Sequence, residues 1–254
     1  MTALIDADSL LYKVCCAIEE KIIWNEPEFD AGIDKVAEIT YSIDINQAYK
    51  TFDQLVENIL FATGCDDCLL VFTTKGNFRD NLPIEYKANR KDLRKPEGME
   101  KLLAYAKTNY TTKDHKDLEA DDICVYLKTQ YPDDYLLCAI DKDVLYQTVG
   151  THYNYNSDEE VTVTEEEAIN YAYYQTLVGD VSDGYKGCPG IGKVKAERAL
   201  ADCTNELEMW QMVVGLFEAK GLTKEDAINT MRLANMHQFN GKGVKLWEPP
   251  IDGV

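Results

Sequence analysis

Four short clusters of acidic side chains stand out in this sequence of 254 residues. They contain Asp6; Glu119, Asp121 and Asp122; Asp141 and Asp143; and Asp180 and Asp183. Carboxylates that have no histidines or cysteines grouped with them favour hard, oxygen-seeking cations such as Mg²⁺ or Mn²⁺. Two such ions about 4 Å apart activate a water and stabilise the leaving oxygen when a phosphodiester is hydrolysed. The clusters therefore predict a two-ion site for phosphodiester chemistry.

The last acidic cluster runs directly into a glycine-rich turn. Asp180 and Asp183 are three residues apart, a spacing that in a helix places both carboxylates on one face. The turn and the predicted basic helix after it contain Gly187, Gly190, Gly192, Lys193 and Lys195. Glycines let a backbone approach phosphates closely, and such turns form anion-binding concavities. Residues 176–200 therefore predict metal ligands beside a grip for a nucleic-acid backbone.

The most basic part of the chain is the segment 77–98, NFRDNLPIEYKANRKDLRKPEG. Its cations are Arg79, Lys87, Arg90, Lys91, Arg94 and Lys95. Phe78 and Tyr86 interleave with them, as is typical of segments that contact phosphates and stack on bases. A solvated surface face is the other interpretation.

Three apolar runs, at residues 2–8, 68–72 and 135–140, are predicted to be buried strands. Segments with helical spacing separate them, so the pattern predicts the α/β class, with a doubly wound, mostly parallel sheet. In such sheets ligands bind outside the carboxyl ends of the strands. Because Asp6, Thr74 and Asp141 stand at these ends, we expect them to share one cleft.

The remaining elements are mostly predicted helices. They cover residues 9–20, 45–64, 99–106, 118–131, 164–177, 205–219 and 224–237. Gly64 is a typical helix C-cap, and Thr164 with Glu167 forms a capping box. Residues 22–43 are predicted to be an irregular loop or insertion, and residues 152–156 a polar edge strand. For Asp8 we favour an N-cap, with Ser9 as the alternative cap, over a metal ligand.

The bulk composition leaves a nucleic-acid partner open. The formal charge of −19 opposes phosphate binding on average, yet the acids gather in clusters that a bound cation would make tolerable. Eight cysteines without metal-site spacing predict reduced thiols. No run is apolar enough to span a membrane, and the N-terminus has no signal-peptide pattern. We therefore expect a cytoplasmic protein without a membrane partner.

Taken together, the motifs resemble the 5′-nuclease (flap endonuclease) superfamily, and most closely the 5′→3′ exonucleases of bacteriophages. The matching pieces, in the family's order, are IDADSLLY, FTTKGNFR, EYKANRK, LEADD, AIDKD, VGDVSDGYKG and GCPGIGKVKAERAL. The match runs from about Asp6 to MRLANMHQFN and LWEP near the end of the sequence. It thus covers nearly the whole chain.

The resemblance implies a fold and a domain division. The fold is a PIN-like α/β core, here residues 1–163, with a basic arch at about 78–112. A helical DNA-binding module of the helix-three-turn-helix type and a C-terminal tail follow, here residues 164–254. The partner implied is DNA with a 5′ end (a duplex end, nick or flap), and RNA in RNA–DNA hybrids is left open. A monomer in the host cytoplasm is expected for a phage protein.

The resemblance also implies the roles of individual residues. The first metal site would comprise Asp6, Glu119, Asp121 and Asp122, and the second Asp141, Asp143, Asp180 and Asp183. Lys87 and Arg90 match a basic pair that contacts the scissile phosphate, with Tyr86 and Lys91 as further DNA contacts. The turn with Gly187, Gly190, Gly192, Lys193 and Lys195 matches the module that binds the duplex backbone, often with a K⁺ ion on its carbonyls. The activity implied is a Mg²⁺- or Mn²⁺-dependent 5′→3′ exonuclease and 5′-flap endonuclease.

One position departs from the family pattern. Where the family usually has an Asp after the second strand, this chain has Thr73 and Thr74, and the alignment places Thr74 there. A hydroxyl brings no charge, so we expect weaker metal affinity at the first site with activity retained.

Two other functions remain as alternatives. A haloacid-dehalogenase-type phosphatase would use Asp6, Asp8, Thr73 and Asp180, with Asp6 as nucleophile. A non-catalytic nucleic-acid binder would keep the glycine turn and the basic segment, and Thr74 would reflect lost chemistry.

Overall fold

The computed structural model describes residues 1–24, 38–90 and 92–251. Its centre is a six-stranded sheet in the order β5-β4-β1-β6-β7-β8. The strands are β1 (Thr2–Asp6), β4 (Asp67–Val71), β5 (Thr112–Lys113), β6 (Tyr135–Cys138), β7 (Gly150–Asn154) and β8 (Glu159–Val163). All neighbours are parallel except β7 and β8. The predicted α/β class with a mostly parallel sheet is confirmed.

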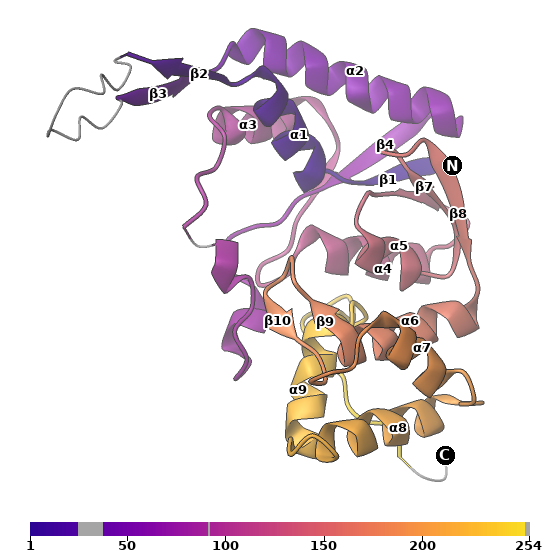
Figure 1. The fold of residues 1–254 in the computed structure, drawn as a ribbon. Coiled ribbons are helices and arrows are strands. Elements are labelled where there is room, and N and C mark those ends of the chain that lie inside the picture. The colour runs from indigo at the N-terminus through magenta and orange to yellow at the C-terminus, as the bar shows by residue number, and fades with distance from the viewer. Residues whose placement is uncertain (25–37, 91, 252–254) are drawn as a thin grey trace, which may run out of the picture.

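Helices cover both faces of this sheet, because successive strand residues point to opposite sides. Ile5 packs among the helices α1 (Asp8–Ile18), α2 (Ile45–Thr63) and α3 (Met99–Asn109). Its neighbour Leu4 packs on the other face, among residues of α4 (Ala120–Gln130) and α5 (Lys142–Tyr146). Figure 1 shows α2 on one side of the strands and α4 with α5 on the other. The sheet is therefore doubly wound.

Local signals in the sequence explain where several helices begin and end. The Asp44 side chain accepts hydrogen bonds from the backbone N–H groups of Asn46 and Gln47, which begins α2. Gly64 ends the same helix in the left-handed region, at φ +65°. Thr164 and Glu167 exchange the predicted capping bonds at the start of α6 (Glu165–Val178). Each device satisfies backbone groups that a helix end leaves free.

The C-terminal third of the chain forms a separate helical layer. Its helices are α6, α7 (Lys193–Leu200), α8 (Glu206–Glu218) and α9 (Lys224–Ala234). They share a hydrophobic cluster that includes Leu177, Trp210, Phe217 and Met231. In Figure 1 this orange and yellow layer lies beyond α4 and α5, on the side away from α2.

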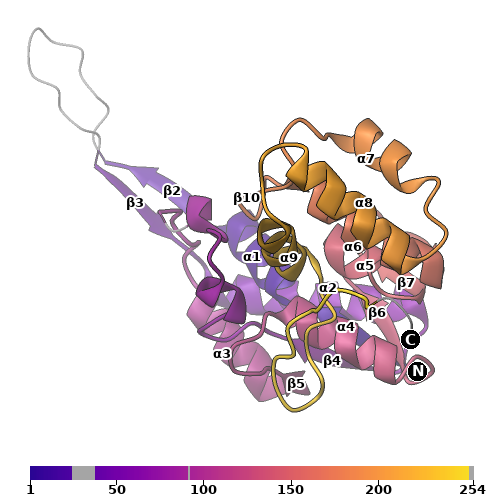
Figure 2. The ribbon, with the colours of Figure 1, turned by 90° about the horizontal axis from the view of Figure 1, so that it is seen from below.

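Two predictions about the strands are wrong. Residues 22–43 are not irregular throughout, because β2 (Glu20–Ile23) and β3 (Ile39–Ser42) form an antiparallel hairpin that projects from the body in Figure 2; residues 25–37 of this segment lie outside the described part. The polar strand predicted at 152–156 is β7, and it is not at the edge, because β8 pairs with it. The sequence of β8, EEVTV, carries too much charge to read as a strand.

The predicted arch range of about 78–112 divides into two parts. Its second part contains α3, whose Leu102 and Ala106 are fully buried in the same cluster as α1 and α2. Its first part contains two short 3₁₀ turns, Phe78–Asn81 and Ala88–Arg90, and its Phe78, Arg79 and Tyr86 side chains are buried. Of the described helices, none has the length and apolar character to cross a membrane.

Candidate metal centre and nucleic-acid interface

The carboxyl ends of the central strands gather acidic side chains, as the sequence predicts. Asp6 ends β1, and Asp141 follows the neighbouring strand β6 as the N-cap of α5. Burial, and after it the charges of Asp8 and Asp141, raise the pKa of Asp6 to about 8. Burial and the charges of Asp6 and Asp141 also raise the pKa of Asp121, on the first turn of α4, well above its usual value. These carboxylates therefore lie close enough to repel one another.

The donor set at this edge fits a hard divalent cation. The Asp6 side chain is 3% exposed, and its Oδ1 atom is buried without a hydrogen-bond partner. A cation would satisfy this oxygen and offset the repulsion among its neighbours. Within the described ranges, no three Asp, Glu, His or Cys side chains converge into a ready-made coordination sphere. Mg²⁺ keeps several water ligands when it binds to protein carboxylates, so it needs only one or two of them directly.

We call Asp6, Glu119 and Asp121 the first carboxylate group. Within this group, Glu119 accepts hydrogen bonds from two neighbouring side chains. Lys87 Nζ lies 2.5 Å from Glu119 Oε1, and the Tyr86 hydroxyl donates to Oε2 over 2.7 Å. Burial favours the neutral acid, yet the cations of Lys87 and Arg79 hold the pKa of Glu119 below its usual value. Glu119 is thus a buried anion with its counter-charge already in place.

Asp122 is predicted to be a ligand of the first site, but the structure places its carboxylate elsewhere. Both of its oxygens accept hydrogen bonds from Arg79, at 2.9 and 2.8 Å, and both side chains are fully buried. Arg79 also donates to the backbone carbonyls of Leu233, in the last turn of α9, and of Asn235, its C-cap. Asp122 therefore joins the start of α4 to the helical layer through Arg79. In a basic stretch Arg79 reads as a surface cation, so its role was missed.

We call Asp141, Asp143, Asp180 and Asp183 the second carboxylate group. Asp143 is 7% exposed and accepts hydrogen bonds from Tyr171 Oη (3.2 Å) and Gln175 Nε2 (2.8 Å). Gln175 Nε2 also reaches Asp180 Oδ2 at 3.2 Å, so one amide bridges two carboxylates. Burial, followed by the charges of Asp141, Asp180 and Asp183, raises the pKa of Asp143 to about 7. The group is brought together as predicted.

The local structure around Asp180 and Asp183 corrects the sequence interpretation. They do not lie on a helix but in a hairpin between β9 (Gly179–Asp180) and β10 (Tyr185–Lys186). Asp180 Oδ1 accepts hydrogen bonds from the backbone N–H of Ser182 and of Asp183. A spacing of three residues serves such a side-chain-stabilised turn as well as a helix. The two carboxylates still lie in the same group.

The basic segment lies across this hairpin. The Lys87 N–H donates to the Asp183 carbonyl over 2.7 Å, and Arg90 Nη2 donates to Asp183 Oδ1 over 2.9 Å. Lys87 adopts the left-handed region at φ +49°, unusual for a residue with a side chain. Its ammonium lies 3.8 Å from Asp183 as well as close to Glu119. Lys87 therefore stands between the two carboxylate groups.

The aromatic residues of the basic segment are not exposed stacking surfaces. Tyr86 is 6% exposed and Phe78 is 7% exposed. The Tyr86 hydroxyl donates to Glu119 and to Asp183, so this side chain braces the two groups instead. This contradicts our expectation that the two rings stack on bases. Lys91, predicted to contact DNA, lies outside the described residues.

The glycine turn contains two kinds of glycine. Gly190, at φ +75°, and Gly192 are exposed, and a Cβ at either would meet nothing within 4 Å. A Cβ at Gly187 would instead meet the carbonyl oxygen of Leu177 at 2.4 Å and Gly179 N at 2.5 Å. Gly187 is thus required for close packing of the hairpin base. The exposed part of the turn is Gly190 to Gly192.

Two lysines stand at the exposed side of this turn. Lys193 and Lys195 are exposed on the first turn of α7. Lys195 Nζ donates to the Gly190 carbonyl over 2.8 Å, so its ammonium is held on the turn itself. The predicted cations and glycines of this module are therefore together on one surface.

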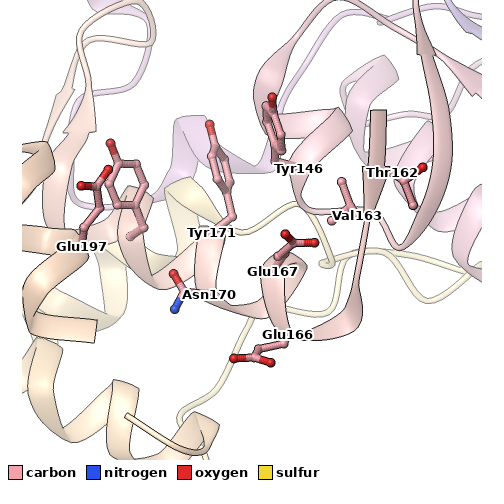
Figure 3. Close-up of a pocket in the computed structure, with 9 residues that line it drawn as sticks. Tyr146, Thr162, Val163, Glu166, Glu167, Asn170, Tyr171 and Glu197 are labelled. Atoms are coloured by element: carbon pink, nitrogen blue, oxygen red, sulfur yellow. The ribbon is translucent and has the colours of Figure 1, made fainter. Parts of the chain in front are cut away.

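A hollow of about 440 Å³ is lined by Tyr146, Tyr171 and Tyr174 among others (Figure 3). Tyr171 stacks on Tyr146 with ring centroids 5.4 Å apart, and its hydroxyl reaches Asp143. The lining includes Glu166, Glu167 and Glu197 and no cationic side chain. Phosphates would be repelled here, so the hollow is not part of the nucleic-acid surface.

The helix cap predicted for Asp8 is wrong. The N-cap of α1 is Ala7, and no side chain caps it. The Asp8 carboxylate instead accepts a hydrogen bond from the Thr73 N–H over 3.0 Å. Thr74, at the position where the family usually has an Asp, donates its hydroxyl to the His115 carbonyl over 3.0 Å.

Two known proteins that are similar in sequence along nearly the whole chain are phage nucleases. The exonuclease of Escherichia phage T7 is 24% identical over 292 aligned residues, covering 96% of this chain and 92% of that protein. The exodeoxyribonuclease of Enterobacteria phage T3 is also 24% identical, over 96% of this chain and 91% of that protein. No protein-family model matches the sequence.

Solved structures share the fold. The 5′-exonuclease of bacteriophage T5, solved with zinc ions, gives a TM-score of 0.67 at 14% identity, over 93% of this chain and 89% of that chain. The catalytic core of Rad2, solved with a DNA substrate, gives 0.52 at 16% identity, over 83% of this chain and 64% of that chain. This chain is therefore similar along nearly its whole length to two phage exonucleases, and it shares the fold of the phage T5 5′-exonuclease.

Proposed function

We propose that this protein is a metal-dependent 5′→3′ exonuclease and 5′-flap endonuclease that hydrolyses phosphodiesters of DNA. The position of Lys87 carries the proposal, because one ammonium faces Glu119 of the first carboxylate group and Asp183 of the second. A phosphate that approaches two acidic groups needs such a cation between them. The sequence relatives are named as exonucleases, and Rad2 was solved with a DNA substrate.

The cofactor we propose is a pair of Mg²⁺ or Mn²⁺ ions. The first carboxylate group would hold one ion and the second group the other, with all-oxygen ligands. Bound there, the ions would supply Lewis-acid stabilisation and an activated water. The phage T5 5′-exonuclease was solved with divalent zinc ions. Asp122 would act indirectly, since Arg79 holds its carboxylate.

The remaining residues position the substrate. Lys87 and Arg90 would stabilise the negative charge that develops on the scissile phosphate. Tyr86, bonded to Glu119 and Asp183, would hold the two groups at a fixed spacing. The turn at Gly190 and Gly192, with Lys193 and Lys195, would bind the duplex backbone, since exposed glycines let phosphates approach.

Several finer points belong to the same proposal. The substrate would be DNA with a free 5′ end, and RNA in hybrids is a second substrate to be assayed. The chain would act as a monomer, with a core at residues 1–163 and a helical DNA-binding module at 164–254. A K⁺ ion at the glycine turn would share the carbonyls of a site where the Lys195 ammonium already contacts Gly190.

The test uses 5′-end-labelled duplex and 5′-flap DNA with Mg²⁺, Mn²⁺ or EDTA. We expect shortening from the 5′ side with either metal and none with EDTA. Asp141→Ala and Asp183→Ala should each abolish cleavage while duplex binding in a gel shift is kept. Asp66→Ala, a change at an exposed residue before β4, should behave as wild type.

Other outcomes would point to the alternatives. A band shift without cutting would identify a non-catalytic binder. Release of a terminal phosphate from an intact strand would identify a phosphatase. Unchanged turnover in Asp141→Ala or Asp183→Ala would disprove the metal assignment.

A further inference from the structure

Asp8 is an acidic residue at the metal edge without a role so far. It begins α1, but the N-cap is Ala7, and no side-chain hydrogen bond caps this helix. Its carboxylate therefore lies in the first turn of α1 without capping that helix.

Strand register determines where Asp8 lies. β1 and β4 are parallel, with Asp6 opposite Val71, and the Ala7 N–H continues the pairing to the Val71 carbonyl at 3.0 Å. Two residues further along each strand, Asp8 stands beside Thr73. The Thr73 N–H then donates to Asp8 Oδ2 over 3.0 Å. The backbone N–H of Thr73, which follows β4, thus holds the carboxylate of Asp8, which follows β1.

The same threonine connects Asp8 to the first carboxylate group. Thr73 Oγ1 accepts a hydrogen bond from the Ala120 N–H over 2.9 Å. Ala120 lies between Glu119 and Asp121, the members of that group on α4. One residue therefore holds both Asp8 and the start of the helix that carries two proposed ligands.

The charges that act on Asp8 come from the same place. The charge of Asp8 is the largest effect after burial on the pKa of Asp6. Burial is the largest effect on the pKa of Asp8 and raises it, whereas the hydrogen bonds from Thr73 lower it. Of the nearby charges, that of Glu119 raises the pKa of Asp8 and that of Lys87 lowers it. Asp8 is half-buried, and the hydrogen bonds of Thr73 hold it beside the start of α4.

The neighbouring Thr74 offers no charge to this edge. Its hydroxyl is bonded to the His115 carbonyl, in the loop that leads to α4. The carboxyl end of β4 therefore carries two hydroxyl residues, and the carboxylate bonded to the Thr73 N–H comes from Asp8.

We propose that Asp8 is a further cation-facing carboxylate, which completes the first carboxylate group and is positioned by Thr73. This inference rests on the proposed metal-dependent function. In this inference, the carboxylate beside the end of β4 comes from Asp8, in the segment that follows β1. The ligand class is a hard divalent cation, Mg²⁺ or Mn²⁺.

The test measures Mn²⁺ binding to the metal-free protein by calorimetry and by the electron-spin signal of the bound ion, without substrate. Asp8→Asn keeps an oxygen that accepts the Thr73 N–H bond and removes only the charge. We expect one of the two Mn²⁺ ions to bind about tenfold more weakly or worse. The metal-free variant should melt at a higher temperature than wild type, because repulsion with Asp6 and Glu119 is relieved. Asp66→Asn is the matched control, since this exposed residue precedes β4 at the opposite end of the strand.

The outcomes separate this inference from the proposed function. Wild-type Mn²⁺ affinity in Asp8→Asn, with two ions bound, would overturn the role of Asp8 and leave the nuclease proposal intact. A lower melting temperature in the metal-free variant would also overturn it, because Asp8 would then be structural. If wild type itself binds no Mn²⁺ and cuts no DNA, the proposed function fails first.

Discussion

The two carboxylate groups differ in how the protein compensates their charge. In the first group, Glu119 has the cations Lys87 and Arg79 beside it, and its pKa is lowered although burial acts against this. In the second group, Asp143 has the neutral donors Tyr171 and Gln175, and burial with like charges raises its pKa to about 7. At neutral pH a proton therefore competes with a metal ion at Asp143 but not at Glu119. Glu119 is thus compensated by fixed cations, whereas the charge state of Asp143 depends on what the second group binds.

Removal of Lys87 should have the largest effect, because this cation faces both groups. We expect Lys87→Ala to slow cleavage by about 10²- to 10³-fold, since a preorganised charge at the reacting phosphate is lost. The measurement is single-turnover cleavage of a labelled 5′ flap, with duplex affinity determined in parallel. Lys50→Ala, an exposed change on α2, is the control. A rate equal to wild type would show that Lys87 does not reach the phosphate.

Replacing Arg79 tests how much the buried ion pair between Arg79 and Asp122 contributes to stability. Arg79→Met leaves Asp122 buried without its partner, so we expect a loss of about 3–5 kcal/mol in the free energy of unfolding. Urea denaturation measures it. The double variant Arg79→Met/Asp122→Leu should recover much of the loss, because no unpaired charge remains. If the single variant were within about 1 kcal/mol of wild type, this ion pair would not hold the two layers together.

The smallest effect is a pH dependence of stability in EDTA. The pKa values of Asp6 (about 8) and Asp143 (about 7) lie above the unfolded value of 3.8, so the folded protein binds more protons. The stabilisation is complete below pH 4 and is lost as the pH rises through 7 and 8. We expect the melting temperature to fall by several degrees between pH 5 and pH 8.5.

Two additions separate the groups in this experiment. Asp143→Asn should flatten the part of the decline near pH 7 and leave the part near pH 8. Saturating Mg²⁺ should reduce the whole decline, because the ion replaces the protons. A melting temperature that stays constant or rises with pH would contradict the assignment of raised pKa values to these two residues.

Local rules predicted the frame of this site better than its details. Asp6 and Asp141 could be placed because apolar runs end at these residues, and the carboxyl ends of parallel strands meet at one edge. Asp122 could not be placed, because nothing in LEADD tells which carboxylate turns toward a distant arginine. Arg79 was predicted to be exposed because it lies in a basic stretch. Its burial depends on partners at residues 122, 233 and 235, which are distant in the sequence.

Turns and edges were the other weak point. The spacing of Asp180 and Asp183 suits a helix and a side-chain-stabilised turn equally, and only Gly179 packed against Gly187 selects the hairpin. Strand β8 exists because β7 offers it a partner, which no property of EEVTV alone reveals. For Asp8, N-cap propensity predicted the wrong role, because the parallel register aims its carboxylate at Thr73.

The contacts of Arg79 have a consequence for how the protein is made. Its guanidinium needs the carbonyls of Leu233 and Asn235, which are synthesised more than 150 positions after Arg79 itself. During translation, the segment that carries Lys87 therefore waits for almost the entire chain before its anchor is complete. A nascent chain that stops short of these residues would hold a charged group without its partners. The buried anchor of this segment is thus completed late in synthesis.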